Sequence, residues 1–336
     1  MRMKGWGNRR MLKPLLLAAA FAAAVAPARA AETIGVNAFP GASNLPVLAG
    51  IQQGLFQRAG IEVTLSHPKG SVDQFKGLAA GSYQVLLTAL DNVVAYRDGR
   101  GEADLGGPMD LVAVMGMDSG FLTLVAAPGT KGIAALKGKT MAVDALTTGF
   151  SFALQDMLAR AGVAKDAVSY VPVGSSGARW KALEDGKAQA ALLSLPLDLE
   201  AADKGFVRLG TVAGTLGPYQ ATVGAVREDW AKDHRATLVA FLKAYRAAVA
   251  WVVAPAHKHA ALAILHQEMP SLDQATLARV LTLLLNRRDG VARDLAINPK
   301  GAAEVLSLRQ RYAAPAARPA HDWRFYVDTS YLAAAR

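Results

Sequence analysis

The sequence predicts an α/β protein with two lobes of similar plan and a helical C-terminal region. The pattern strand, loop, helix, strand, loop, helix, strand occurs twice, at about residues 33–90 and 139–194. Strands that alternate with helices in this way form βαβ units around a parallel sheet. From Asp229 onward the apolar spacing is helical. The chain of 336 residues is long enough for two domains of about 100–200 residues each.

The first series begins with a short apolar run that reads as a buried strand. A helix follows in which Val47, Leu48, Ile51 and Leu55 fall on one face. Further along, Ser71 is expected to cap a helix at its N-terminus. The expected strands of this series are 33–39, 61–65 and 83–88, and the expected helices are 46–56, 71–78 and about 91–97.

Two strand-like runs, 111–117 and 122–127, separate this series from the second one. The second series opens with a helical turn at 133–136. Its expected strands are 139–143, 168–173 and 188–193, and its helices run from about 149 to 161 and from about 174 to 184. The helices expected in the C-terminal region are 238–253, 260–265, 274–284 and 301–312.

Residues 1–30 have the three parts of a secretory signal peptide. Residues 1–13 carry five basic side chains and no acidic one, an apolar run follows at 15–26, and Ala28-Arg29-Ala30 is a small-x-small cleavage site. The apolar run is shorter than the roughly 20 residues that span a bilayer. We therefore expect cleavage near Ala30 and Ala31, and a function outside the cytoplasm.

Composition limits the partners of the exported chain. Loss of the six basic residues of the signal peptide lowers the formal charge from +10 to +10 − 6 = +4, too small an excess for a nucleic-acid binder. The chain has no cysteine, which excludes disulfides, thiolate metal sites, a cysteine nucleophile and a lipid anchor at the cleavage site. A protein that is not membrane-anchored suits a Gram-negative periplasm.

The candidate site lies beyond the carboxyl ends of the expected strands, where open α/β sheets bind ligands. The candidate residues share this placement in the loops that follow the strands, or flank the last expected strand. They are Asn37, Phe39, Gly70, Ser71, Thr88, Asp91 and Asn92 in the first series, Asp144, Thr147, Thr148, Gly149, Phe150, Gly174, Ser175, Ser176, Arg179 and Ser194 in the second, and Tyr219 and Gln220 after it.

Two of these loops have the character of an anion site. Thr147–Gly149 and Gly174–Gly177 place hydroxyls and free backbone N–H groups at a helix start. The same residues are equally typical of ordinary N-caps and turns, and both interpretations stay open. Arg179 can pair a carboxylate or sulfonate bidentately, or lie on the surface of its helix.

Acidic residues point away from a plain inorganic anion. Asp91, Asp118 and Asp144 would all lie near one cleft and would repel an anion such as nitrate. Two of them also have a local interpretation, in which Asp91 caps its helix and Asp144 fixes a turn. Phe39, Phe150 and Tyr219 would supply aromatic walls and Gln220 an amide, which favours a flat organic ligand.

The motifs of several enzyme classes are absent. The sequence has no Gly-x-Ser-x-Gly, no phosphate-binding Gly-x-x-x-x-Gly-Lys-Ser/Thr and no His-Glu-x-x-His. The only histidine cluster, His257, His259 and His266, lies on a polar segment flanked by prolines and reads as solvated surface and not as a zinc site. We therefore expect neither a metal nor another cofactor.

Residues 49–63, Ala-Gly-Ile-Gln-Gln-Gly-Leu-Phe-Gln-Arg-Ala-Gly-Ile-Glu-Val, resemble a stretch shared by a family of extracytoplasmic solute-binding proteins of ABC importers. This family handles nitrate, taurine, alkanesulfonates and thiamine-pyrimidine precursors. Segments 70–81, 87–92, 138–144 and 326–331 are similar to the family as well. The resemblance covers essentially the whole chain after the signal peptide and does not name the ligand.

The resemblance implies the type II periplasmic binding protein fold, with two Rossmann-like α/β lobes joined by two crossover strands. Lobe one would be 31–117 plus about 220–336, with the C-terminal helices packed on it, and lobe two about 121–215. The crossovers would lie near 115–123 and 217–226.

The resemblance also implies partners. The protein would bind a small organic solute, such as a sulfonate, an aromatic carboxylate or a pyrimidine, and deliver it as a monomer to an ABC permease and its ATPase. Two alternatives stay open: a cytoplasmic enzyme of pyrimidine or menaquinone biosynthesis with the same fold, and a sensor or partner protein unconnected with ABC transport.

Overall fold

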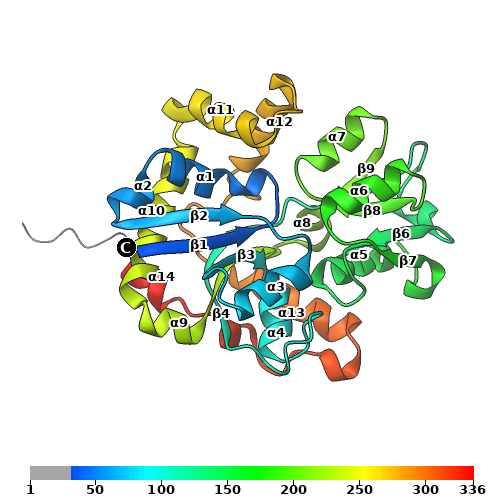
Figure 1. Cartoon of the computed structure of the whole chain (residues 1–336). Coiled ribbons are helices and arrows are strands. Elements are labelled where there is room, and N and C mark those ends of the chain that lie inside the picture. Colours follow the sequence, from blue (N-terminus) through cyan, green and yellow to red (C-terminus); the bar gives the residue numbers. More distant parts are fainter. Residues whose placement is uncertain (1–31) are drawn as a thin grey trace, which may run out of the picture. The chain divides into compact units, whose positions relative to one another are not determined.

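The computed structural model describes residues 32–336, which fold around two five-stranded mixed sheets (Figure 1). In each sheet a single strand runs against the other four. The first sheet has the order β2-β1-β3-β10-β4, from β1 (Glu32–Ala38), β2 (Ile61–Ser66), β3 (Val85–Ala89), β4 (Leu111–Asp118) and β10 (Thr222–Arg227). The second has the order β7-β6-β8-β5-β9, from β5 (Thr123–Ala126), β6 (Thr140–Val143), β7 (Ser169–Pro172), β8 (Ala190–Leu193) and β9 (Val207–Thr211).

Helices cover both faces of each sheet (Figure 1). In chain order they are α1 (Leu45–Gln52), α2 (Leu55–Arg58), α3 (Ser71–Ala79), α4 (Leu90–Arg97), α5 (Gly149–Arg160), α6 (Ser176–Glu184), α7 (Leu197–Asp203), α8 (Val212–Leu216), α9 (Glu228–Asp233), α10 (Arg235–Val253), α11 (Lys258–Glu268), α12 (Gln274–Leu284), α13 (Pro299–Tyr312) and α14 (Ser330–Ala334). The predicted α/β class with two lobes is confirmed.

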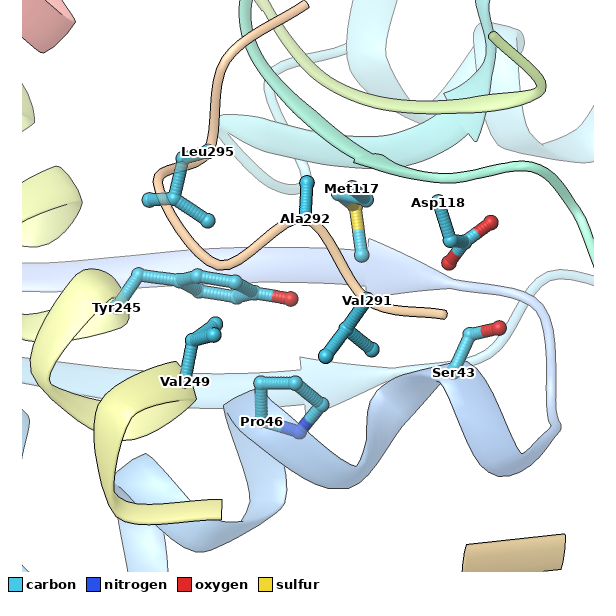
Figure 2. Close-up of a pocket in the computed structure, with 9 residues that line it drawn as sticks. All are labelled: Ser43, Pro46, Met117, Asp118, Tyr245, Val249, Val291, Ala292 and Leu295. Carbon is cyan, nitrogen blue, oxygen red and sulfur yellow. The ribbon is translucent and has the colours of Figure 1, made fainter. Parts of the chain in front are cut away.

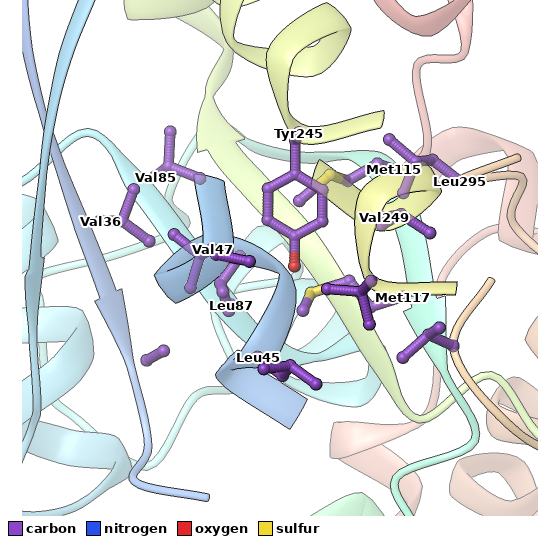
Figure 3. Close-up of a cluster of buried hydrophobic side chains, with 14 of the residues drawn as sticks. Val36, Leu45, Val47, Val85, Leu87, Met115, Met117, Tyr245, Val249 and Leu295 are labelled. Carbon is purple, nitrogen blue, oxygen red and sulfur yellow. The ribbon is translucent and has the colours of Figure 1, made fainter. Parts of the chain in front are cut away.

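One face of the first sheet packs against α1 and α10 in a continuous apolar core. Val36, Val85 and Leu87 project from the strands toward Val47 of α1 and Tyr245 of α10 (Figure 3). These side chains are almost fully buried, and removal of such apolar area from water contributes about 25 cal/mol per Å².

In the second sheet, alternate residues of one strand enter different cores. Met141 and Val143 of β6 belong to the core formed with α5, whereas Ala142 between them packs with α6. Successive side chains of a strand point to opposite faces. Because both faces are covered by helices, the strand is a continuous apolar run instead of an alternating one.

Helix α10 is long and apolar enough to cross a membrane by length and composition alone, with 19 residues and a mean hydropathy of 1.5. In the structure it is a core helix. Phe241 stacks on Phe56 of α2 with ring centroids 5.5 Å apart, and Leu238, Leu242 and Val249 are buried in the same core.

The chain passes from the first sheet to the second through residues 119–122 and returns through α8 and residues 217–221. The first passage turns at Gly120, whose φ of 84° is in the left-handed region that favours glycine. The lobe boundaries drawn from the sequence stay a prediction. The predicted signal peptide lies outside the described residues.

Three local predictions were wrong. The helix expected at 46–56 is divided into α1 and α2, because Gly54 adopts a φ of 64° and ends the first helix. The N-cap position of α3 is Gly70, and Ser71 is already the first helical residue. The segment 197–216, for which no element was predicted, forms α7, β9 and α8.

Candidate solute-binding cleft

The loops at the carboxyl ends of the strands meet where the two lobes touch. Gly149 opens α5 in the second lobe so close to α4 of the first that a Cβ on it would lie 2.5 Å from the Cβ of Asp91. At a second contact, a Cβ on Gly41 of the first lobe would lie 3.5 Å from the carbonyl oxygen of Leu195 of the second. Loops of the two lobes thus contact each other at these two points, and we call the region between the lobes the cleft.

Asp91 is held by an arginine that the sequence analysis did not consider. Arg309 of α13 donates from Nε to Oδ1 of Asp91 at 2.7 Å and from Nη2 to Oδ2 at 2.6 Å. Both side chains are nearly inaccessible, with 2% and 1% of their areas exposed. A bidentate pair of this kind satisfies both carboxylate oxygens, so Asp91 stabilises the wall of the cleft from within.

The same arginine reaches the second lobe. Its Nη2 also donates to the carbonyl oxygen of Thr147 at 3.2 Å, and its guanidinium carbon lies 5.3 Å from the ring centroid of Phe152 in α5. The hydroxyl of Thr147 itself donates to Glu102 of the first lobe. The loop before α5 is therefore bonded to the first lobe twice, by the Thr147 carbonyl to Arg309 and by the Thr147 hydroxyl to Glu102.

Asp144 and Arg179 are buried in the second lobe close enough for their charges to interact. Burial raises the pKa of the Asp144 carboxyl, and Arg179 and the Thr148 hydroxyl only partly offset this effect. Thr148 donates to Asp144 at 2.7 Å and caps α5 by accepting from the N–H of Ser151. Asp144 therefore fixes the turn before α5, one of the two interpretations that the sequence allows.

Arg179 is a buried structural residue in this structure. Its Nε donates to the carbonyl oxygen of Leu192 at 2.8 Å and its Nη1 to that of Gly174 at 2.7 Å. Burial lowers the pKa of its guanidinium, and Asp144 opposes the shift. The side chain ties α6 to β8 and does not lie on the surface of its helix. Its part in binding a solute stays a prediction.

The serines of the second lobe also support the loops. Ser175 accepts from the N–H of Ala178 and caps α6, while Ser176 accepts from the N–H of Ser194 at 2.9 Å. Gly174 adopts a φ of 93° at the turn. Phe150 is half-buried against the core that contains α5.

In the first lobe, buried polar side chains lie at the carboxyl ends of β1 and β3. Asn37 donates to the hydroxyl of Ser66 at 2.9 Å and accepts from Nε2 of Gln74 at 3.2 Å. Asn92 donates to the hydroxyl of Thr88 at 3.1 Å. Phe39 is half-buried directly after β1, and Gly70 is the N-cap of α3, whose first residue is Ser71.

Gln220 links the return passage to the first passage. It donates to the carbonyl oxygens of Asp118 and Thr222 and accepts from the N–H of Asn298 at 2.8 Å. Tyr219, which is buried beside it, has a pKa raised by burial and, to a lesser extent, by Asp91 and Asp144. Tyr219 therefore lies near the carboxylates of both lobes.

Asp118 ends β4 beside a small cavity in the first lobe. The cavity has about 10 Å³ open to the centre of a water molecule, roughly the room of one water. Ser43, Asp118 and Val291 line it, and the hydroxyl of Tyr245 points into it from α10 (Figure 2). Asp118 accepts from the N–H of Gly120 at 2.7 Å, and burial raises the pKa of its carboxyl.

A larger cavity lies between the second lobe and the end of α12. It has about 120 Å³ open to the centre of a water molecule. Its walls include Phe121 and Thr123 of the first passage, Asp198, Arg208, and Asn286 and Asp289 after α12. We call it the hinge cavity. None of these residues was predicted from the sequence, except as part of the chain between the lobes, because their meeting depends on α7 and β9, whose short patterns predict no element.

The arginines of the cleft are committed to protein groups. Arg309 is bonded to Asp91, Arg179 to two backbone carbonyls, and Arg208 to Asp198 at 2.8 Å. These three arginines are therefore each bonded to groups of the protein itself. Among the described residues, no basic side chain contributes to the raised pKa of the Asp118 carboxyl. Among residues 32–336, no three histidine or acidic side chains are grouped so that they could hold a metal ion.

Comparison with known proteins assigns the chain to a family. A family model described as NMT1/THI5 like matches residues 42–258. The chain belongs to the NMT1/THI5-like family. No curated protein matches the sequence significantly. The predicted resemblance to extracytoplasmic solute-binding proteins is thereby confirmed.

Solved structures share the fold of this NMT1/THI5-like protein at low identity. The periplasmic nitrate-binding protein NrtA from Synechocystis PCC 6803 has a TM-score of 0.75 and 13% identity over 90% of this chain and 88% of its own. The periplasmic aliphatic sulphonate-binding protein SsuA from Escherichia coli has a TM-score of 0.64 and 18% identity over 83% and 85%. A protein from Bordetella bronchiseptica RB50 has a TM-score of 0.73 and 19% identity over 92% and 97%.

Proposed function

We propose that this NMT1/THI5-like protein is a periplasmic receptor that captures a small organic solute between its lobes and delivers it to an ABC permease, whose ATPase drives import. The observation that carries the proposal is the meeting of strand-end loops from both lobes in one cleft, seen in the contact of Gly149 with Asp91. In α/β proteins such edges are where ligands bind.

The printed names of the structural relatives support the class of function. NrtA and SsuA are named for the periplasm and for the solutes they bind. The signal peptide predicted at 1–30 and the absence of a cysteine for lipid attachment agree with a freely diffusing periplasmic protein. A cytoplasmic enzyme of the same fold is not favoured, because it would need no export signal.

Capture requires contacts with the solute from both lobes. A ligand shifts the balance between open and closed forms only through a difference in its affinity for them. The chain crosses between the lobes at 119–122 and 212–221, and short connections of this kind absorb the backbone changes of hinge closure. The solute would bind one lobe first and be enclosed when the second lobe adds its contacts.

The test is a thermal-shift screen of the chain from Ala31, stripped of carried-over ligand by partial unfolding and dialysis. The solutes are sulfonates, taurine, nitrate, aromatic carboxylates, pyrimidines, amides and amino acids. A solute at about 1,000 times its Kd should stabilise the protein by about 4 kcal/mol, which raises the Tm by several degrees. If none of these classes raises the Tm, the receptor proposal is wrong for them.

Export is tested separately. Deletion of residues 2–30 should leave the protein in the cytoplasm, measured by cell fractionation against the full-length chain. Unchanged export of the shortened protein would contradict the signal-peptide prediction.

A further inference from the structure

Two ion pairs join the lobes among residues 32–336, and their surroundings differ. Arg311 of α13 donates to Asp156 of α5 at 2.6 Å, and the Asp156 side chain is 2% exposed. At the other edge of the interface (Figure 1), Nη1 of Arg279 in α12 lies 2.9 Å and 3.0 Å from the two carboxylate oxygens of Asp203 in α7. These two side chains are 45% and 48% exposed. One pair therefore has an enclosed carboxylate, and the other is open to solvent.

The α5 side of the interface is held by more than its ion pair. The hydroxyl of Tyr312 also donates to Asp156, at 2.9 Å. Val93 of α4, Phe152 of α5 and Leu308 of α13 belong to one apolar core. Separating the lobes on this side would expose that core to water, which is unfavourable. We therefore expect the α5 side to stay together when the lobes move.

The α7 side is held in another way. The hinge cavity, with about 120 Å³ open to the centre of a water molecule, interrupts the packing between the second lobe and the end of α12. Within residues 32–336, the pair of Arg279 and Asp203 is the only ion pair that crosses the interface on this side. An attraction between two exposed charges therefore acts where apolar packing is interrupted.

The two sides should respond differently to salt. Dissolved ions screen exposed charges, and the screening length falls from about 30 Å at 0.01 M to about 3 Å at 1 M salt. Buried and partly buried pairs are screened much less. Salt should therefore weaken the attraction between Arg279 and Asp203 more than the contacts around Asp156.

We propose that Arg279 and Asp203 form an ionic latch, which holds the lobes together on the α7 side and which salt loosens. A pair this exposed shifts the balance between closed and open forms by about two- to fivefold. Because the apparent affinity of a receptor follows the population of its binding-competent form, the latch tightens solute binding by up to the same factor. The inference rests on the lobe closure of the proposed function and does not depend on which solute binds.

Single-molecule fluorescence energy transfer tests the latch without a solute. The chain has no cysteine, so Ala263→Cys on α11 and Lys187→Cys after α6, both at exposed positions, place one dye on each lobe of the full mature chain. At low salt, Arg279→Met should lower the ratio of closed to open molecules two- to fivefold. Arg279→Glu adds repulsion and should lower the ratio further. The reversed pair, Arg279→Glu with Asp203→Arg, should restore it.

Arg324→Met is the matched control, because it removes one positive charge from an exposed pair with Asp322 inside the first lobe and should leave the ratio unchanged. In 1 M sodium chloride the ratio of the parent should fall to that of Arg279→Met, whereas the ratio of the variant should change little. A ratio that neither Arg279→Met nor salt alters, or a reversed pair that does not restore it, would overturn the latch. In that case a solute that raises the Tm of the parent and of Arg279→Met alike would leave the receptor function intact.

Discussion

The buried pair of Arg309 and Asp91 gives a prediction whose size follows from the structure. Replacing Arg309 with methionine keeps an apolar body of similar length and leaves the Asp91 carboxylate buried, with 1% of its side chain exposed. Breaking a buried ion pair from one side costs about 3–5 kcal/mol, because an uncompensated charge remains. We expect Arg309→Met to lower the free energy of unfolding by that amount.

The double variant separates the buried charge from lost packing. Asp91→Asn removes the carboxylate charge, so Arg309→Met in that background no longer strands it. We expect the double variant to cost about 2–3 kcal/mol less than the sum of the single variants, at the upper end of coupling energies between contacting residues. Urea unfolding followed by tryptophan fluorescence measures all four proteins.

A surface pair supplies the matched control. Arg324 lies 3.4 Å from Asp322, and these side chains are 72% and 65% exposed. Exposed pairs contribute about 0–1 kcal/mol, so Arg324→Met should change stability little. If Arg309→Met costs no more than Arg324→Met, or if the two changes at the buried pair are simply additive, the reasoning about the cleft wall is wrong.

Three further changes probe the cleft. The raised pKa of Asp118 means that the folded protein binds its proton more tightly than the unfolded chain, so stability falls as the pH rises from about 3.8 through the folded pKa. Asp118→Asn should therefore stabilise the protein at pH 7, and this gain in urea unfolding should vanish toward pH 3; a gain that is independent of pH contradicts it. Gly149→Ala should lower the free energy of unfolding by about 1–3 kcal/mol through its contact with Asp91, whereas Gly177→Ala, whose nearest neighbour would lie 3.9 Å away, should not. Thr148→Ala should lower it by about 1 kcal/mol by removing the cap of α5 and should weaken solute binding in calorimetry, and unchanged affinity would argue against this loop as part of the solute site.

The elements that the sequence predicts well are those with a complete apolar period. Helices such as α10 and α12 present apolar residues every three or four positions, and the strand β8 is a continuous apolar run. Such patterns mark the residues that face the core, because an element of the fold buries its apolar face. The two-lobe class followed from their alternation along the chain.

The elements between β8 and β10 were missed because they are short and partly exposed. Helix α7 has seven residues, α8 has five, and β9 is an edge strand with exposed positions. An element of one or two helical turns cannot repeat an apolar period, so local patterning does not reveal it. The hinge cavity depends on these elements and was missed with them.

The pairing of charges could not be read from spacing either. Asp91 and Arg309 are 218 positions apart, and only the packing of α13 against α4 and α5 joins them. The sequence made Arg179 the candidate for binding an acidic solute, because it is the arginine near a predicted strand end. In the structure its Nε and Nη1 donate to the backbone of Leu192 and Gly174, which no sequence pattern indicates.

These contacts also determine which side of the cleft separates more easily. On the side of α5, residues of α4, α13 and α5 share one apolar core, and Arg311 and Tyr312 both bond to Asp156 across the lobes. On the side of α7, the half-exposed pair of Arg279 and Asp203 joins the lobes, and the hinge cavity interrupts their packing. Half-exposed ion pairs contribute little, whereas buried apolar area must be returned to water when a core is opened. The α7 side should therefore open first.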